Sequence, residues 1–355
     1  MARGFGIALE SEYGDVQSID DIDLDWFQKM EEVNFELGDE AETDDGGSRS
    51  DVVAWAGAAK PNGSTSAKVD LQRVTWYLLG FLDHYIYTEG TGTLSGLSIH
   101  EFYGGENHEL PSFVGLAVYD ALKIAVFGLI EDGLKLEVSD SAMTVNNDWL
   151  YATETAEILG IDEDFEEPEE LADSAIPIRF YDVTVKLNGE KPGSVQTSFS
   201  LEGSNNHDQD GTIGLGSRFP QEKPQAAKRT ISLSLATTLN RHSYRDILNA
   251  RYGVVDAVTP SACRILTVPL ELTIAQCEHP EQQLVVKFPE CTLKAEFDLK
   301  GADRVEATLN LQTLGNGEVT LNDGTTTVNT DMYCKLINKV PELAIEDDSE
   351  DEQEP

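Results

Sequence analysis

Few residues in this sequence have the types and spacing that chemistry requires. His100 and His108 lie close together and are each followed by a glutamate, an arrangement that could hold a metal ion. The residues between them include Gly104-Gly105, however, so we predict a loop in which both histidines are ordinary polar residues. The sequence contains no GxxxxGK(S/T) phosphate loop, no HExxH zinc helix and no GxSxG nucleophile elbow.

One stretch matches the first half of a calcium-binding loop. Asn206, Asp208, Asp210 and Gly211 follow the pattern D-x-(D/N)-x-(D/N)-G. The twelfth position is Ser217, where such loops carry a bidentate glutamate, so a cation would bind weakly. A turn rich in Asn, Asp and Gly is the simpler interpretation. We therefore predict no catalytic, cofactor-binding or metal-binding residues, and we expect the protein not to be an enzyme.

The charge balance is strongly acidic. The chain has 65 Asp and Glu residues against 25 Lys and Arg residues, with acids concentrated in Glu36–Asp45, Asp162–Asp173 and Glu342–Pro355. Such acidity serves either a basic partner or the solvent. Because acids occur in every segment, we favour the solvent: in molar salt the Debye length is about 3 Å, and repulsion between surface carboxylates is screened. The acidity also argues against tight binding of DNA, whose phosphates require Lys and Arg.

The cysteines and the hydropathy exclude further classes. Cys263, Cys277, Cys291 and Cys334 form no CxxC pair, so we expect buried, reduced thiols rather than a zinc or redox site. No run of 18 apolar residues exists, so we expect no transmembrane helix. The first ten residues lack the basic and apolar regions of a secretion signal.

The elements that position these residues are predicted to be strands. Apolar and polar residues alternate with a period of two, which is typical of strands with one buried and one exposed face. The stretches with this pattern are 134–138, 183–187, 195–201, 231–235, 266–274, 293–299 and 305–311. The last two flank a short link that contains a glycine, which predicts a β-hairpin. Pro269 places its strand at a sheet edge or at a bulge.

Helical spacing is confined to two short segments. Residues 71–82 follow Asp70, a suitable N-cap, and residues 243–248 begin with a sequence similar to a capping box. We therefore predict a mainly β fold, an antiparallel β-sandwich or barrel with one or two short α-helices and long acidic loops. One domain is expected over residues 1–340. Its long loop or hairpin covers 36–66, a second loop covers 203–228, and 341–355 form an acidic flexible tail.

A series of short motifs also runs along the chain in a definite order. The motifs are Gly6–Gly14, Glu109–Phe113, Gly133–Val138, Pro177–Gly189, Val195–Asn206, Leu215–Ser217 with Pro220 and Arg229, Phe288–Leu293, Asp303–Leu309 and Leu336–Asn338. In order and spacing this series resembles the major tail tube proteins of long-tailed, siphovirus-like viruses. The departures are the acidic stretches and Glu290, where asparagine is typical. The acidity fits a halophilic, archaeal host.

The resemblance implies a structural virion protein of the tail-tube type. Copies of such proteins form hexameric rings with a closed inner barrel, and the rings stack head to tail into a hollow tube through which the genome is ejected. The 36–66 segment is expected to reach the neighbouring ring. The implied location is the virion tail, after assembly in the host cytoplasm, with no membrane and no cofactor.

The resemblance also implies the partners. They are other copies of this chain and the tape measure, tail terminator and baseplate proteins, while viral DNA passes through the lumen without sequence-specific binding. A different virion β-protein, such as a head decoration or tail-terminator subunit, is the alternative. A halophilic enzyme on a β-scaffold is a third hypothesis, which the missing motifs disfavour.

Overall fold

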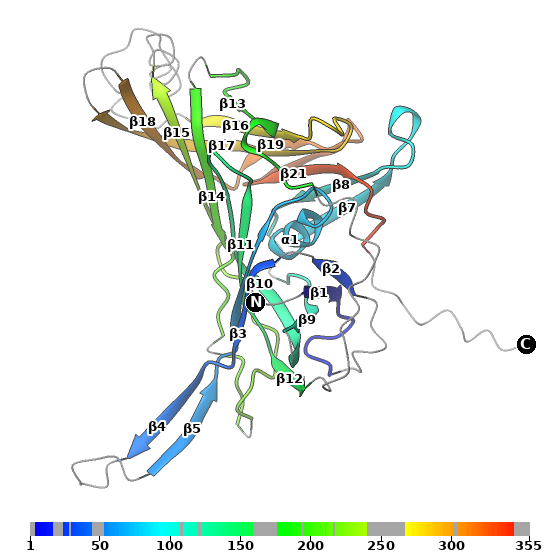
Figure 1. Cartoon of the computed structure of the whole chain (residues 1–355), viewed down its shortest axis with the longest axis vertical. Coiled ribbons are helices and arrows are strands. Elements are labelled where there is room, and N and C mark those ends of the chain that lie inside the picture. Colours follow the sequence, from blue (N-terminus) through cyan, green and yellow to red (C-terminus); the bar gives the residue numbers. More distant parts are fainter. Residues whose placement is uncertain are drawn as a thin grey trace, which may run out of the picture.

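The computed structural model describes residues 4–16, 24–27, 30–44, 53–106, 109–119, 122–158, 176–192, 195–209, 211–215, 217–239, 267–300 and 304–343. Within these residues the chain consists of antiparallel strands, one α-helix and short 3-10 turns (Figure 1). The predicted mainly β, antiparallel fold is therefore confirmed. The strands form three sheets, which are connected by two long strands, β10 (Leu122–Val138) and β17 (Gln283–Lys300).

The first sheet has the strand order β2–β1–β9–β10–β12. It comprises β2 (Asp25–Phe27), β1 (Gly4–Leu9), β9 (Phe113–Val118), the first half of β10 and β12 (Thr153–Ile158). β10 leaves this sheet around Gly128, whose φ of 67° suits glycine, and at a register shift between Glu131 and Gly133. The second half of β10 then belongs to the second sheet.

The second sheet has the order β3–β6–β11–β10–β14–β15–β18–β17. Its strands are β3 (Met30–Glu36), β6 (Asn62–Lys68), β11 (Thr144–Leu150), the second half of β10, β14 (Val195–Ser204), β15 (Thr230–Leu239), β18 (Arg304–Thr313) and the second half of β17. The ladder between β17 and β18 reaches the pair Lys300–Arg304, which confirms the predicted hairpin. The alternation in β14 holds only in part, because Val195 and Thr197 are exposed.

The third sheet has the order β13–β16–β17–β21–β8–β7. It comprises β13 (Val183–Leu187), β16 (Thr267–Ala275), the first half of β17, β21 (Tyr333–Asn338), β8 (Ser98–Tyr103) and β7 (His84–Glu89). Pro269 lies where the register between β16 and β17 shifts, so it occupies a bulge. This confirms one of the two predicted alternatives, a sheet edge or a bulge. Two small hairpins stand apart from the sheets: β4 (Asp39–Asp44) with β5 (Val53–Ala59), and β19 (Gly317–Thr320) with β20 (Thr327–Thr330).

Among the described residues the α-helix is α1 (Val74–Phe81), which confirms the first predicted helix but begins later than expected. The Asp70 carboxylate accepts hydrogen bonds from the backbone N–H groups of Gln72 (2.9 Å) and Arg73 (3.0 Å), so it caps the turn that leads into α1. Residues 243–248, the second predicted helix, lie outside the described residues. In the part of the chain that the structure describes, no helix is long and apolar enough to span a membrane.

All of α1 is buried, and the helix contacts each of the three sheets. Trp76 packs edge-on against Phe113 of the first sheet, with ring centroids 6.1 Å apart. Phe81 covers Gly203 of the second sheet so closely that a Cβ atom there would lie 2.3 Å from its ring. Asn338 of the third sheet donates a 2.9 Å hydrogen bond to the Thr75 hydroxyl. A helix that is apolar on all sides is typical of a core element, and α1 holds the sheets together.

Two predicted boundaries need correction. The 36–66 segment, predicted as a long loop or hairpin, does contain a hairpin, β4–β5, which projects from the body (Figure 1). The hairpin is shorter than the predicted segment, because the segment begins at the end of β3 and ends in β6, which pairs with β3 and β11. The acidic tail does not begin at 341, because the backbone N–H of Leu343 donates a 3.2 Å hydrogen bond to the Tyr85 hydroxyl. The remainder of the tail and the acidic run 162–173 lie outside the described residues.

Candidate functional site

One face of the second sheet is polar across its width. Leu134, Leu201, Leu233 and Leu309 are buried on the other face, and their sequence neighbours point outward because side chains alternate along a strand. The register aligns the outward side chains in rows that cross the strands. We call this surface the polar sheet face. It comprises Glu32, Ser64, Ser66, Lys68, Lys135, Glu137, Thr144, Asn146, Asp148, Ser198, Ser200, Glu202, Ser204, Thr230, Ser232, Ser234, Ala236, Thr292, Lys294, Glu296, Thr308, Asn310 and Gln312.

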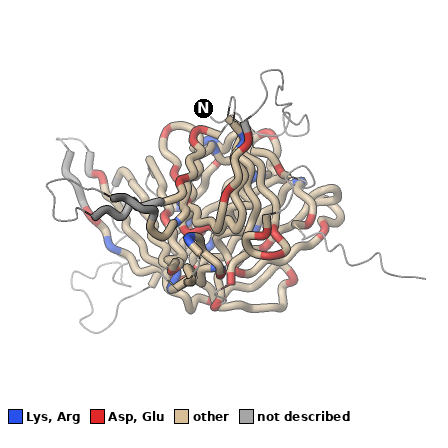
Figure 2. The backbone as a smooth tube through the Cα atoms, turned by 90° about the horizontal axis from the view of Figure 1, so that it is seen from below, with Lys and Arg blue, Asp and Glu red and all other residues tan. Residues whose placement is uncertain are grey.

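The few cations on the polar sheet face stand beside carboxylates. Lys135 Nζ lies 3.1 Å from Glu137, and Lys294 Nζ lies 2.9 Å from Glu296. The third lysine, Lys68, lies 3.7 Å from a glutamate of β3. Such exposed ion pairs add little to the stability of the fold. In each of them, however, a carboxylate lies next to the lysine and neutralises its charge. Carboxylates outnumber lysines on this face, and Figure 2 shows acids around the rest of the body as well.

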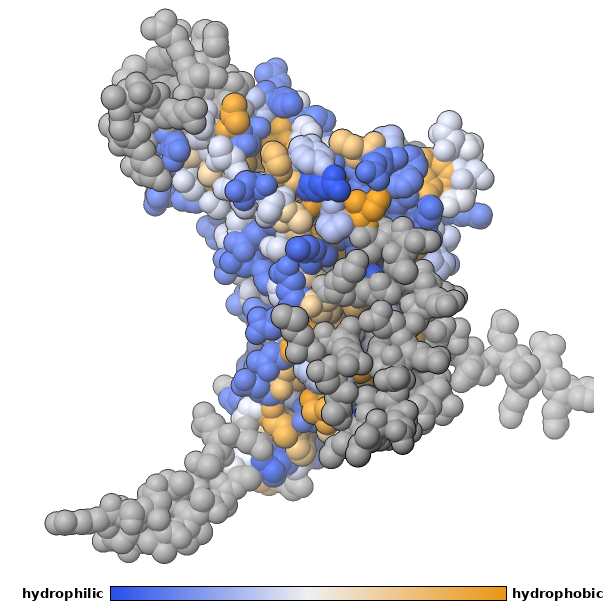
Figure 3. Space-filling view, viewed as in Figure 1, coloured by the Kyte–Doolittle hydropathy of each residue, from blue (hydrophilic) through white to orange (hydrophobic). Residues whose placement is uncertain are grey.

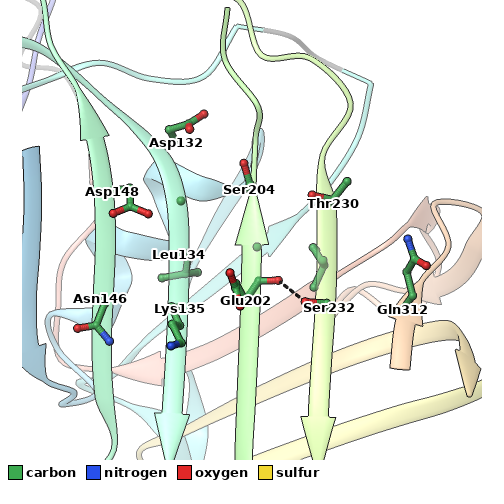
Figure 4. A pocket seen from close by; sticks show the side chains of 13 residues that line it. Asp132, Leu134, Lys135, Asn146, Asp148, Glu202, Ser204, Thr230, Ser232 and Gln312 are labelled. Carbon is green, nitrogen blue, oxygen red and sulfur yellow. Dashed lines mark hydrogen bonds between the residues drawn. The ribbon is translucent and has the colours of Figure 1, made fainter. Parts of the chain in front are cut away.

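A hollow of about 580 Å³ opens on the polar sheet face between β11, β10, β14 and β15 (Figure 4). Asp148 of β11 and Glu202 of β14 point into it from either side of β10, and the Ser232 hydroxyl donates a 3.4 Å hydrogen bond to the Glu202 carbonyl. Burial, then the negative charges of Asp132 and Glu202, raise the pKa of Asp148. Among the described residues, no three His, Cys, Asp or Glu side chains lie close enough to hold a metal ion.

Asp132, at the rim of this hollow, is held by the loop that follows β14. Its carboxylate accepts hydrogen bonds from His207, from the backbone N–H at 2.8 Å and from Nδ1 at 2.9 Å. Burial alone would raise the pKa of Asp132, but the two His207 bonds and the His207 charge outweigh burial and lower it. The His207 side chain is only 1% exposed, so this pair ties the loop to the bulge in β10.

The predicted loop around His100 is wrong, because His100 and Glu101 lie in β8 and are buried. His100 lies 3.0 Å from the Tyr85 hydroxyl through Nδ1 and 3.1 Å from the Val340 carbonyl through Nε2, and burial lowers its pKa. Glu101 accepts a 2.6 Å hydrogen bond from the Tyr333 hydroxyl. Both side chains therefore serve packing between strands. His108 lies outside the described residues.

In the stretch that matches a calcium loop, the first residue, Asn206, takes part in a structural turn. Asn206 donates from Nδ2 to the Lys228 carbonyl at 2.8 Å, which closes the base of the loop between β14 and β15. Its φ of 51° is left-handed, as expected of asparagine in a turn. Asp210, the third residue of the predicted pattern, lies outside the described residues.

The cysteine prediction holds for two of the three described thiols. Cys291 and Cys334 are buried, and burial raises the pKa of both, that of Cys291 to about 12. Cys277 is exposed, which corrects the prediction. It lies just after β16, where the strand has left the sheet. Cys263 lies outside the described residues.

The loop that spans residues 205–229 braces the root of the β4–β5 hairpin. The Ala59 N–H donates to the Arg218 carbonyl at 2.8 Å, and Arg218 Nε donates to the Gly57 carbonyl at 3.2 Å. The far end of the loop is anchored by Arg229, which binds Asp331 at 3.0 Å and Asp83 at 3.3 Å. The loop thus supports the root of the hairpin, which projects from the lower end of the molecule (Figure 1).

Sequence reasoning missed the buried polar groups at the junction of the sheets. Glu131 is fully buried and accepts a hydrogen bond from the Asn147 amide, and burial raises its pKa well above 4.5. No spacing distinguishes Glu131, Asp132 or Asp83 from the other carboxylates of so acidic a chain. The series of motifs in the sequence did include Arg229, but it did not identify its partners, Asp83 and Asp331.

Comparison with known proteins adds no family. No protein-family model and no curated protein matches the chain. The expectation of a tail tube protein therefore rests on the order of the motifs in the sequence.

Proposed function

We propose that this chain is the tail tube subunit of a long-tailed virus with a halophilic host. Six copies form a ring, the rings stack into a hollow tube, and the polar sheet face lines the bore through which the genome passes. The observation that carries the proposal is the polar sheet face, a broad antiparallel surface of hydroxyl and amide groups whose lysines are already paired.

A conduit for DNA must stay wet and must not hold the DNA. Serine, threonine, asparagine and glutamine bind water through hydroxyl and amide groups and carry no charge for phosphate to neutralise. In molar salt the screening length is about 3 Å, so contact pairs decide whether phosphate sticks. Lys135 and Lys294 each have a carboxylate in contact, and Glu202 and Asp148 add negative charge nearby. This composition favours passage without retention.

The second sheet also offers an edge for assembly. From Leu293 to Lys300, β17 pairs with β18 on one side, and no other described strand pairs with it on the other. An unpaired edge is a template for another chain, and a ring of copies leaves no edge exposed. The strands next to this edge, β14, β15 and β18, carry the stretch of the polar sheet face that is richest in hydroxyl and amide groups. We assign that stretch to the bore.

Stacking is the role we assign to the projecting β4–β5 hairpin. It extends away from the sheets, and the 205–229 loop supports it at Gly57 and Ala59. A head-to-tail contact of this kind does not close, so it generates a filament.

The test is negative-stain electron microscopy of the purified protein in about 2 M salt, where carboxylate repulsion is screened. Hollow tubes or stacked six-fold rings support the proposal. Monomers or closed trimers at high concentration would overturn it and favour a head decoration or tail-terminator role.

A matched variant separates ring formation from stacking. Replacement of residues 41–56 by Gly-Ser-Gly shortens the hairpin above its braced root and leaves the sheets intact. We expect this variant to form six-fold rings and to lose long tubes. Tubes of normal length from this variant would refute the role of the hairpin while leaving the ring assignment standing.

A further inference from the structure

The chain beyond β21 is bound to the third sheet through a histidine and a tyrosine. Residues 339–343, which we call the C-terminal strap, follow β21, whose neighbours are β8 and then β7 (Figure 1). The Val340 carbonyl lies 3.1 Å from Nε2 of His100 in β8. The Leu343 N–H donates a 3.2 Å hydrogen bond to the hydroxyl of Tyr85 in β7. The strap is therefore held at two points by two adjacent strands.

The two contacts are connected through the imidazole ring of His100. A carbonyl oxygen only accepts hydrogen bonds, so Nε2 carries the proton in the contact with Val340. The other ring nitrogen, Nδ1, then accepts from the Tyr85 hydroxyl, which lies 3.0 Å away. The Tyr85 oxygen in turn accepts from Leu343. This chain of hydrogen bonds requires a neutral His100, because a protonated imidazole has no acceptor.

Burial of His100 favours this neutral form. The side chain is fully buried, and burial lowers its pKa, although the acceptors on Val340 and Asn338 act in the opposite direction. The closed strap therefore keeps the imidazole away from water, where its protonated form would be stable.

The other titratable groups around the ring are two tyrosines and the charged residues of the strap. Tyr85 and Tyr87 of β7 lie with their ring centroids 5.9 Å and 5.6 Å from that of His100. Burial, with a smaller contribution from the charge of Glu342, raises the pKa of Tyr85 to about 12, so Tyr85 keeps its proton where a histidine titrates. Lys339 and Glu342 are exposed.

The strap covers a row of aromatic rings. Tyr85, His100 and Phe102 stack with ring centroids between 5.2 Å and 6.3 Å apart, and Leu343 packs against the core cluster that contains Phe102. In the view of Figure 3, apolar side chains appear at the surface only in small groups among hydrophilic residues. An uncovered aromatic row would be a larger apolar surface than these groups, and the strap keeps it from water.

We propose that this contact is a pH-sensitive latch, in which protonation of His100 releases the C-terminal strap and uncovers the aromatic row. A proton on Nδ1 removes the acceptor that the Tyr85 hydroxyl needs and places a charge on a buried ring. Release of the strap lets the charged imidazole reach water. The latch acts within one copy, so it does not depend on assembly into a tube.

The direction of the effect follows from proton linkage. With the strap released, His100 has its ordinary pKa of 6.5, and with the strap closed its pKa is lower. The released state therefore binds the proton more tightly. The contribution of His100 to closure is complete above about pH 6.5 and is lost as pH falls toward the pKa of the closed state.

Hydrogen–deuterium exchange of the full chain, followed by mass spectrometry at pH 5, 6 and 7.5, tests the latch. After correction for intrinsic exchange rates, we expect the protection of the strap amides to fall about fivefold or more between pH 7.5 and pH 5. The protection of β21 should stay unchanged. A strap whose protection does not change, or that loses protection together with β21, would overturn the proposal.

Two variants assign the pH dependence to a side chain. His100→Gln keeps a donor for the Val340 carbonyl and does not titrate, so its strap should show equal protection at all three pH values. Glu342→Gln removes the carboxylate of the strap and should keep the pH dependence of the wild type. Persistence of the dependence in His100→Gln, or its loss in Glu342→Gln, contradicts the assignment to His100.

A matched pair of tyrosine variants tests the hydrogen bonds even where His100→Gln does not fold. Tyr85→Phe removes the hydroxyl that joins His100 to Leu343, so the strap should lose protection already at pH 7.5. Tyr87→Phe makes the same change on the same strand, beside the same histidine, and should leave the strap protected. Equal protection in the two variants would overturn the latch.

Discussion

The buried carboxyl group of Glu131 permits a sharp test of the packing at the sheet junction. Its Oε1 accepts a hydrogen bond from the Asn147 amide, while its Oε2, the Asn147 Oδ1 and the Tyr77 hydroxyl have no described partner. A charge in so dry a position is costly, so burial raises the pKa of this carboxyl group well above 4.5 and favours its protonated form. Glu131→Gln keeps the shape and the hydrogen-bond acceptor and carries no ionisable group.

The sign of the effect follows from proton linkage. Glu131 binds its proton more tightly in the folded state than at its unfolded value of 4.5. Its contribution to stability is therefore complete below about pH 4.5 and is lost as pH rises toward the folded pKa. Across that window, each pH unit lowers the folding equilibrium constant of the wild type about tenfold relative to Glu131→Gln. Above pH 4.5 the two proteins should therefore diverge in stability as pH rises, with the variant gaining.

The assay is urea denaturation followed by tryptophan fluorescence, at constant 2 M salt and at pH 5, 6 and 7. The difference between the wild type and the variant isolates Glu131, because the other carboxyl groups are common to both proteins. Glu137→Gln on the polar sheet face removes one carboxyl group from the surface and controls for net charge. A constant difference between the wild type and Glu131→Gln across this range would refute a raised pKa of Glu131.

Three further outcomes are expected. Arg229→Ala leaves its two aspartates buried without their cation, which should cost about 3–5 kcal/mol in urea denaturation, whereas Arg179→Ala at the surface should cost little. Glu202→Lys places an unpaired cation on the polar sheet face, so tubes of this variant should co-sediment with double-stranded DNA at the lowest salt that keeps tubes intact, where wild-type tubes leave DNA in the supernatant. With Cys263 replaced by Ala, one thiol of the native protein, Cys277, should react with a disulfide reagent, and the two buried thiols should react only after unfolding.

The sequence predicts most of the sheet architecture because period-two alternation reports burial directly. Residues 231–235 and 305–311 show this, because they lie in two strands, β15 and β18, that pair with each other without a register shift. The same reasoning fails in the 36–66 segment, where it did not predict a strand. Its strand β6 reads Asn-Gly-Ser-Thr-Ser-Ala-Lys, and its inward positions, Thr65 and Ala67, are too small and polar to mark a buried face.

The site is less predictable than the fold. The polar sheet face consists of residues that each look like ordinary exposed strand positions, and only the register shows that they align across neighbouring strands. The prediction for His100 failed for a different reason. The glycine pair that follows it in the sequence suggested a loop, but His100 lies in a buried strand. Arg229 shows the same limit, since its partners Asp83 and Asp331 are distant in sequence.

The distribution of cations distinguishes two causes of the acidity better than the acids do. A halophilic solvent selects acids on every surface, and acids do surround the described body (Figure 2), so their number says nothing about a conduit. Salt that screens charge beyond about 3 Å also removes any long-range repulsion of DNA by the bore. What remains decisive is contact, and Lys135 and Lys294 on the polar sheet face both touch carboxylates. A bore that must release DNA predicts this pairing of its lysines.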